Sequence, residues 1–312
     1  MRLGSLCSGI GGLELGVERA LGALTVWQAE IDPHASKVLA HRFPGVPNIG
    51  DVRDLTAMTP VDILTAGYPC QPFSTAGRRK GTDDPRHLWP AVHAAIAHLG
   101  PSLVVLENVR GHLTLGFDRV LGDLADIGYD AEWRVVRASD VGCCHQRARL
   151  FVAAYPGGAV RGRDGRGIHG AEKAVGDQAF GDRPRDGRGA TAAHTNGNAS
   201  RRQPRDLHGA QDANGAVSDS GNGPGHSGGR ARFGPYAAAV RRQEQWHGPA
   251  PEPTTDGRLN PAFVEWMMGY PRGWVTDVLD SRNAALRCLG NAVVPQVAEA
   301  FCLGLLDGRA AA

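Results

Sequence analysis

Short apolar runs alternate with segments of helical periodicity in the first half of the chain. The apolar runs predict strands, and segments with apolar residues three or four positions apart predict helices. The strands are expected at Arg2–Leu6, Thr25–Glu30, Val61–Gly67, Ser102–Val109, Ala131–Arg137 and Arg149–Tyr155. The helices are expected at Leu13–Ala20, Pro33–His41, Arg86–His98 and Leu115–Ile127. This alternation predicts an α/β fold with a mostly parallel, doubly wound sheet covered on both faces.

The pattern changes sharply at Pro156. From there to Arg258, Gly, Arg, Asp, Asn and Ser dominate, and few large apolar residues are available to offset the entropy lost on ordering the chain. We expect this region to be partly disordered, as either a linker or a segment that becomes ordered on nucleic acid. Apolar residues then return at helical spacing, and Pro295–Leu306 predicts a closing helix. The expected parts of the chain are residues 1–155, 156–258 and 259–312.

Composition narrows the classes of protein that fit. The 312 residues are 42% hydrophobic with a formal net charge of +2, so charge alone does not indicate a nucleic-acid binder. There is no run of eighteen apolar residues and no secretory signal at the N-terminus, so we expect a cytoplasmic protein without a membrane segment. The six cysteines form no C-x-x-C pair, which predicts reduced thiols and no metal site.

A glycine-rich turn follows the first predicted strand. It lacks the full G-x-G-x-x-G spacing, which favours a nucleoside without a pyrophosphate, such as S-adenosylmethionine, over a dinucleotide. A turn that binds no ligand is the alternative. Glu30 ends the second predicted strand, where a carboxylate can accept hydrogen bonds from a ribose diol, and Asp51 could bind an adenine amino group. The turn comprises Cys7, Ser8, Gly9, Ile10, Gly11 and Gly12.

Cys70 lies between Pro69 and Pro72, directly after the apolar strand Val61–Gly67. Two prolines stiffen this loop, and the carboxyl end of a central strand is where a nucleophile is displayed. A small buried hydrophobic residue is the alternative role for a single cysteine. Glu107 ends the strand Ser102–Leu106, where a buried carboxyl can hold a proton at neutral pH, although a strand-end Glu can also cap the next helix.

Arg147 and Arg149 come just before the last strand of this part, in His145-Gln146-Arg147-Ala148-Arg149. Side chains two positions apart in an extended segment face the same way. Paired guanidinium groups can hold a phosphate or a base carbonyl, and a solvated basic pair is the alternative.

Together and in this order, the motifs resemble the DNA cytosine-5 methyltransferase family. The resemblance covers residues 3–155 and 259–302 and includes Leu259–Pro271 and Leu289–Pro295. It implies a Rossmann-like, S-adenosylmethionine-dependent methyltransferase fold with a smaller, largely irregular target-recognition region. It also implies that the C-terminal segment packs back on the catalytic domain.

The resemblance further implies a mechanism. Cys70 would attack C6 of a cytosine that has been flipped out of duplex DNA, while Glu107 protonates or hydrogen-bonds N3. The activated C5 would take a methyl group from S-adenosylmethionine, and loss of the C5 proton would expel Cys70. Arg149, with Arg147, would hold the cytosine carbonyl and the neighbouring backbone.

The resemblance implies a cofactor site made from distant segments. The Cys7–Gly12 turn would bind the methionine part, and Glu30 the ribose. Ile31 and Asp51 would flank or bind the adenine, and Leu88 would line its pocket. Asn291 and its loop would complete the site from the C-terminus. Val52, Pro69 and Ala292 are the remaining expected cofactor contacts.

Recognition of a DNA sequence is expected from the middle region, where Ala231–Trp246 has a helical pattern. Its candidate base- or phosphate-binding residues are Arg232, Tyr236, Arg241 and Arg242. The expected partners are double-stranded DNA and, functionally, a restriction endonuclease, for a protein that is expected to be monomeric. A tRNA methyltransferase and a non-catalytic DNA-binding relative are the alternatives. The target sequence, and the choice between a restriction–modification enzyme and an orphan or phage methylase, stay open.

Overall fold

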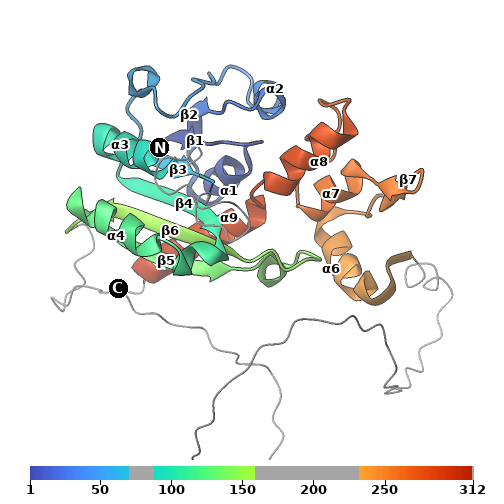
Figure 1. Cartoon of the computed structure of the whole chain (residues 1–312). Coiled ribbons are helices and arrows are strands. Elements are labelled where there is room, and N and C mark those ends of the chain that lie inside the picture. Colours follow the sequence, from blue (N-terminus) through green and yellow to red (C-terminus); the bar gives the residue numbers. More distant parts are fainter. Residues whose placement is uncertain (70–87, 159–231, 311–312) are drawn as a thin grey trace, which may run out of the picture. The chain divides into compact units, whose positions relative to one another are not determined.

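In a computed structural model that describes residues 1–69, 88–158 and 232–310, six strands form the main sheet (Figure 1). Their order is β2-β1-β3-β4-β6-β5. The strands are β1 (Arg2–Leu6), β2 (Leu24–Ala29), β3 (Ile63–Ala66), β4 (Leu103–Val109), β5 (Tyr129–Val136) and β6 (Arg149–Pro156). The sequence-based α/β prediction is therefore confirmed, and all six strands lie where the apolar runs predict them.

The sheet is mixed rather than wholly parallel. Strands β1 to β4 pair in parallel, whereas β6 is antiparallel to both β4 and β5. A parallel connection needs a crossover that is usually an α-helix. Between β5 and β6 the chain has instead only the 3₁₀ turn η4 (Ala138–Val141) and a short loop, so β6 returns beside β5 in the opposite direction.

Residues alternate between the two faces of the sheet, and helices cover both. Leu3, Ile63 and Val105 face one apolar cluster, whereas Leu64 and Leu106 face the other. Helices α1 (Gly12–Leu21), α2 (Pro33–Arg42), α8 (Arg282–Asn291) and α9 (Pro295–Ala310) contribute to the first cluster. Helices α3 (Trp89–Leu99) and α4 (Phe117–Asp126) contribute to the second. Both faces are thus buried, which explains why the strands read as continuous apolar runs.

Several helices begin where the sequence supplies a capping side chain. The Asp32 carboxylate accepts hydrogen bonds from the backbone N–H groups of His34 (2.9 Å) and Ala35 (3.1 Å), and Pro33 occupies the first turn of α2. Asn260 caps α7 (Pro261–Met267) in the same way. The sequence therefore fixes these helix starts locally.

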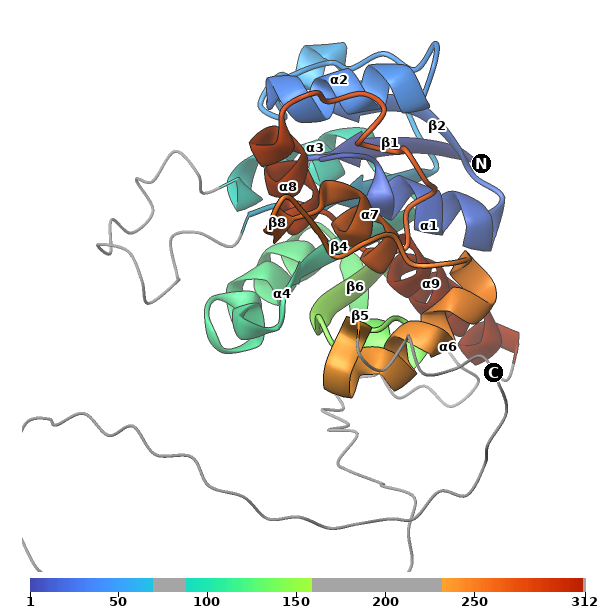
Figure 2. The same cartoon turned by 90° about the vertical axis from the view of Figure 1, so that its right-hand side faces the viewer.

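A group of smaller elements lies beside the sheet, and Figure 2 shows it from a second direction. It is built around a small apolar cluster of Val240, Ala250 and Trp266. The elements are η5 (Gly234–Tyr236), α6 (Ala237–His247), β7 (Thr254–Thr255), β8 (Arg258–Leu259) and α7, while η1 (Leu55–Ala57) and η3 (Arg110–Thr114) belong to the sheet region. The helical pattern noted in Ala231–Trp246 is thus a helix from Ala237 onward.

The C-terminal segment returns to the first strand and the first helix. The Trp274 indole N–H donates to the carbonyl oxygen of Ile10 (2.9 Å), and the Tyr270 hydroxyl donates to that of Val293 (2.8 Å). Helix α9 packs along α1. Residues more than two hundred positions apart therefore form one core.

The segment Arg282–Asp307, which spans α8 and most of α9, is long and apolar enough to cross a membrane, because an 18-residue stretch within it has a mean hydropathy of 1.4. Half of that stretch is buried in the structure, and the non-helical residues 292–294 separate the two helices. Buried core helices pass the same test, so this feature is weak evidence for a membrane span.

Candidate active site

Four strands bring their ends to one row at the carboxyl edge of the sheet. Leu6 pairs with Ala29 on one side and with Ala66 on the other, and Ala66 pairs with Leu106. The residues that directly follow these four in sequence all line one cavity of about 820 Å³. They are Glu30, Cys7, Gly67 and Glu107. This volume lies within the range of pockets that hold a small-molecule ligand.

Most of the residues predicted for the site line this cavity. They are Cys7, Gly9, Ile10, Glu30, Ile31, Asp51, Val52, Pro69, Leu88, Glu107, Arg147, Arg149 and Asn291. Ser8, Gly11, Gly12 and Ala292 do not line it. The predicted nucleophile Cys70 lies outside the described residues, and Pro69, its neighbour in sequence, is part of the cavity wall.

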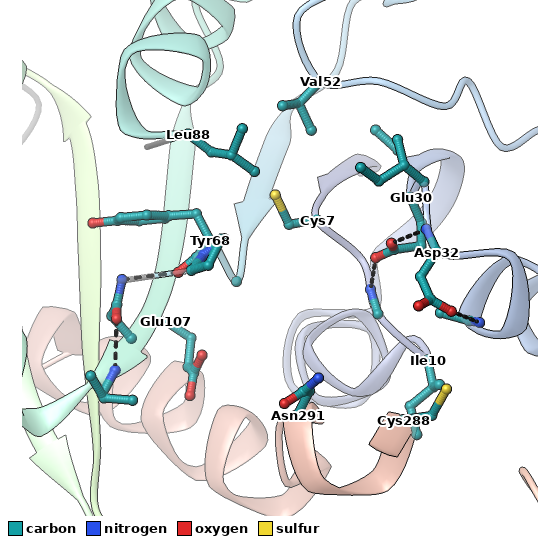
Figure 3. Close-up of a pocket in the computed structure, with 18 of the residues that line it drawn as sticks. Cys7, Ile10, Glu30, Asp32, Val52, Tyr68, Leu88, Glu107, Cys288 and Asn291 are labelled. Carbon is teal, nitrogen blue, oxygen red and sulfur yellow. Dashed lines mark hydrogen bonds between the residues drawn. The ribbon is translucent and has the colours of Figure 1, made fainter. Parts of the chain in front are cut away.

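Glu30 joins the glycine-rich turn to the start of α2. Its Oε2 accepts a hydrogen bond from the Gly9 N–H (2.8 Å), and its Oε1 accepts one from the Asp32 N–H (2.8 Å) (Figure 3). Burial raises the pKa of this carboxyl above its ordinary value. Because each carboxylate oxygen has two lone pairs, both oxygens can accept a further hydrogen bond from a ligand hydroxyl.

Cys7 occupies the middle of the cavity, between Glu30 and Glu107 (Figure 3). Its backbone is left-handed, with φ of 53°, which is uncommon outside glycine and turns the chain sharply after β1. Burial raises the pKa of its thiol to about 12, so the side chain is neutral at physiological pH.

The wall on the Glu30 side is largely apolar. Ile10, Ile31, Val52 and Leu88 contribute to it, and a flat heterocycle fits between such side chains. Asp51 also lies in this wall, and its carboxylate is paired with the Arg53 guanidinium at 3.0 Å.

Glu107 and Arg149 form the other end of the cavity. The Arg149 Nε lies 3.1 Å from Glu107 Oε1, and both side chains are mostly buried. Burial raises the pKa of Glu107 to about 7, while the nearby charges of Arg149 and Arg147 oppose this rise. The carboxyl is thus protonated in a large fraction of molecules at neutral pH, and it can donate a proton as well as accept one.

Arg147 connects the same end of the cavity to the C-terminal segment. One of its terminal nitrogens donates to the carbonyl oxygens of Gly290 (2.8 Å) and Ala292 (2.7 Å), at the end of α8. A cation is favourable there, because the last carbonyls of a helix lack partners within it. The Arg147 backbone has φ of 29°, so Arg147 and Arg149 do not follow one extended strand as the sequence suggested.

A family model described as C-5 cytosine-specific DNA methylase matches residues 1–304. The chain belongs to this family. Among its relatives, the Type II methyltransferase M.NgoMIV of Neisseria gonorrhoeae is 38% identical over 156 residues, which are 47% of this chain and 50% of that protein. Type II methyltransferase M.HgiBI of Herpetosiphon aurantiacus is 36% identical over 155 residues, covering 47% of this chain and 35% of that protein. The chain therefore spans half or less of the length of these curated relatives.

Solved structures agree with the fold. The Dnmt2 methyltransferase of S. pombe superposes with a TM-score of 0.58 at 15% identity, covering 99% of both chains. A mutant of Spodoptera frugiperda DNMT2 superposes with a TM-score of 0.56 at 16% identity, covering 97% of this chain and 99% of that one. The predicted Rossmann-like methyltransferase fold is confirmed.

The four predicted residues that do not line the cavity have structural contacts of their own. The Ser8 hydroxyl donates within β1, to Ser5. Gly11, with φ of 85°, begins α1 in a left-handed conformation. A Cβ at Gly12 would collide with the Tyr270 hydroxyl and the Val293 carbonyl oxygen, so Gly12 permits the close approach of the C-terminal segment. The carbonyl group of Ala292 holds Arg147.

The cavity also contains residues that the sequence did not single out. Asp32 and Arg287 form an ion pair at 2.9 Å between the start of α2 and helix α8, and both line the cavity. Asn108 donates to the carbonyl oxygen of Tyr68 (3.0 Å), which fixes the backbone just before Pro69. The capping pattern Asp32-Pro33 was a visible local signal, whereas the pairing with Arg287 depends on tertiary packing.

Proposed function

We propose that this chain transfers a methyl group from S-adenosylmethionine to C5 of a cytosine in a specific duplex DNA sequence, through a temporary bond between Cys70 and C6. Membership of the C-5 methylase family and the Type II methyltransferase names of its relatives support DNA as the substrate. The observation that carries the proposal is the buried Glu107, held against Arg149 in the same cavity as Glu30.

Glu107 supplies the proton that activates the base. A cytosine ring has no nucleophilic carbon at C5 until a nucleophile adds to C6. With a pKa of about 7, Glu107 can donate its proton to N3 as the Cys70 sulfur bonds to C6. Electron density then accumulates at C5. Arg149 and Arg147 lie beside the carboxylate that remains and stabilise its charge, and they can also hold the cytosine carbonyl.

The remaining steps restore the ring. C5 would take the methyl group that the bound cofactor supplies, the electron pair of the broken C–S bond would stay on the cofactor's sulfur, and the C5 proton would then leave to a base or to water. The electron pair of the C5–H bond re-forms the C5–C6 double bond and expels the Cys70 thiolate, while N3 returns its proton to Glu107. Atoms and charges therefore balance, and the cysteine is regenerated. Since C6 is inaccessible in a stacked duplex, the cytosine must be flipped out of the helix.

The properties of the other cysteines support Cys70 as the nucleophile. Burial raises the pKa of Cys7, Cys143 and Cys302 to about 12 and that of Cys144 and Cys288 to about 11. None of these five carries a thiolate at neutral pH, and the thiolate is the reactive form. Cys70, the sixth cysteine, follows Pro69 of the cavity wall.

The residues at the Glu30 end fit S-adenosylmethionine. Glu30 can accept hydrogen bonds from both ribose hydroxyls, and Ile31, Val52 and Leu88 provide an apolar surface for an adenine. A Cβ at Gly9 would meet no atom within 4 Å, so space is open above the glycine-rich turn for the methionine part. When bound, this cofactor supplies an electrophilic methyl group. Cys7, Ile10, Asp51, Pro69 and Asn291 complete the proposed binding surface.

The biological setting follows from the same proposal. Sequence recognition would come from the region 156–258, including Arg232, Tyr236, Arg241 and Arg242, whose described side chains are exposed or half-buried. A cytoplasmic, monomeric enzyme would then protect DNA against a companion restriction endonuclease, as the Type II names of the relatives suggest.

The decisive experiment maps 5-methylcytosine at single-base resolution in DNA from a methylation-free host that expresses the protein. Methylation in one short sequence context, lost in Cys70→Ala but kept in Cys302→Ala, is the expected result. Cys302 is a matched control because it is a fully buried cysteine of α9, away from the cavity. Soluble protein that leaves DNA unmethylated but methylates tRNA would overturn the DNA substrate. Methylation retained in Cys70→Ala would overturn the nucleophile.

A further inference from the structure

Helix α6 is hydrogen-bonded to the loop that precedes Arg147 through the side chain of Gln243. Gln243 is fully buried, and its Oε1 accepts a hydrogen bond from the Cys144 N–H (2.8 Å). Its Nε2 donates to the carbonyl oxygens of Trp266 (2.7 Å) and Met267 (3.2 Å), at the end of α7. The amide oxygen thus faces a donor and the amide nitrogen faces two acceptors, which fixes the orientation of the amide group.

Two further contacts strengthen this attachment. His145 Nε2 donates to the same Met267 carbonyl oxygen (3.0 Å). Trp246, one turn along α6, lies against Gly142, where an added Cβ would be 3.3 Å from the indole nitrogen. The backbone from Gly142 to His145 is therefore attached to α6 and α7 rather than to the sheet alone.

The same loop leads directly into the two arginines of the cavity. Arg147 follows His145 by two positions, and its guanidinium is held by the end of α8. Arg149 then reaches Glu107. A shift of the Cys144–His145 backbone would consequently change the position of Arg147 and the Arg149–Glu107 pair, because no flexible segment separates them.

The two faces of α6 have different environments. Ala237, Val240 and Gln243 form its buried face, whereas Arg241 and Arg242 are exposed on the other side. Exposed arginines on a helix can contact DNA phosphates or bases. Gln243, on the buried face, therefore joins the helix that carries these arginines to the loop that leads to Arg147.

We propose that Gln243 is a positioning residue that links α6, on the recognition side of the protein, to Arg147 and Arg149 in the active site. This inference rests on the proposed methyl transfer to DNA. Gln243 touches neither substrate nor cofactor. Its three hydrogen bonds keep the arginine pair aligned with Glu107 when the recognition region is engaged.

The test compares Gln243→Met with Gln245→Met in the full-length protein. Met has nearly the shape of Gln but forms none of the three hydrogen bonds, and Gln245 is an exposed glutamine on the same helix. The readouts are the thermal midpoint, DNA and cofactor dissociation constants, the single-turnover rate on a cytosine duplex, and the pH dependence of that rate. A DNA duplex that contains 5-fluorocytosine measures the number of competent sites, meaning those that form the bond to Cys70. Fluorine cannot leave C5 as the proton does, so Cys70 stays bonded to the base.

We expect Gln243→Met to lower the single-turnover rate per competent site by roughly 10- to 100-fold, with DNA and cofactor affinities within about threefold of wild type. Its pH profile should also shift, because the Arg149 charge lowers the pKa of Glu107 against the larger effect of burial, and a displaced Arg149 lowers it less. Gln245→Met should keep the wild-type rate per competent site and the wild-type pH profile, whatever its effect on DNA affinity. Gln243→Glu should have a lowered rate as well, because a carboxylate cannot donate to the two carbonyl groups.

Two outcomes separate the proposals. If wild type transfers methyl groups and Gln243→Met has an unchanged rate and pH profile per competent site, Gln243 has only a structural role and this inference is overturned alone. A loss confined to thermal stability or to the number of competent sites leads to the same conclusion. If the wild-type protein does not transfer methyl groups to DNA, the proposed function and this inference are overturned together.

Discussion

The guanidinium of Arg149 reaches across two antiparallel strands and lies 3.1 Å from the carboxyl of Glu107. In the register of β4 and β6, Arg149 stands opposite Val109, two residues beyond Glu107, so the contact is diagonal. Burial favours the protonated form of Glu107, whereas the arginine favours the charged form. The balance between them holds the pKa near 7, where a group can both give and take a proton.

Replacing Glu107 by Gln should reduce methyl transfer by about 100-fold or more, within the range that general acids contribute. Gln keeps the size and can donate a hydrogen bond to N3, but it cannot transfer a proton. Single-turnover rates and DNA dissociation constants check this, with DNA affinity expected to change by less than threefold. Parallel losses in rate and in DNA affinity would assign Glu107 a binding role instead.

The pH dependence of the rate should report the same carboxyl. Burial raises the pKa of Glu107 from 4.5 to about 7, so the proton-donating form is present below pH 7 and is lost as pH rises through 7. The rate should therefore fall on the alkaline side. Arg149→Met removes a charge that lowers this pKa, so the fall should move to higher pH in the residual activity. Arg119→Met, which removes an exposed arginine of α4 paired with Asp123, should leave the profile in place.

Glu30→Gln should weaken cofactor binding by roughly 10- to 100-fold, equivalent to about 1.4–2.8 kcal/mol. A Gln side chain keeps one acceptor oxygen, so it cannot accept the Gly9 and Asp32 N–H groups and also serve both ribose hydroxyls. Calorimetric titration with S-adenosylmethionine measures the change. Asp54→Asn is the matched control, because Asp54 is an exposed carboxylate that does not line the cavity. Equal affinities for Glu30→Gln and wild type would remove Glu30 from the cofactor site.

Gly12→Ala should lower the free energy of unfolding by about 1–3 kcal/mol, the cost of overpacking a tight site. The added methyl group would collide with the Tyr270 hydroxyl and the Val293 carbonyl oxygen. Gly122→Ala, in the exposed part of α4 where a Cβ meets nothing within 4 Å, should instead be neutral or stabilise by up to about 1 kcal/mol. Denaturant titrations of both variants check the contrast, and equal effects would show that Gly12 does not mediate this packing.

The sequence predicted the positions of the strands and helices well, because the spacing of apolar residues along a segment follows from which of its faces is buried. It predicted the direction of β6 less well, although a signal was present, since no helix separates Ala131–Arg137 from Arg149–Tyr155. The cavity residues were predicted partly from strand ends and motifs and partly from the family resemblance, which alone indicated Ile31, Leu88 and Asn291. The raised pKa of Glu107 agrees with its position after an apolar strand. The catalytic and cofactor roles stay predictions.

Long-range contacts could not be predicted from the pattern. Trp274 reaches Ile10, and Gln243 reaches Cys144, through hydrogen bonds that depend on how distant segments pack. A glutamine within a polar helix carries no local sign that it is buried. The same applies to the close approach of Tyr270 and Val293 to Gly12.

The row formed by Ala29, Leu6, Ala66 and Leu106 sets the length of the reaction site. Neighbouring strands are about 4.8 Å apart, so three strand spacings place the backbones of Glu30 and Glu107 on the order of 14 Å from each other. Backbone hydrogen bonds, not side chains, maintain that distance. A slip of one strand by a single residue would turn its edge residue to the opposite face. Side chains around the cavity can therefore change with little effect on the spacing between the backbones of Glu30 and Glu107. A change in the sheet register would alter the arrangement of these two residues.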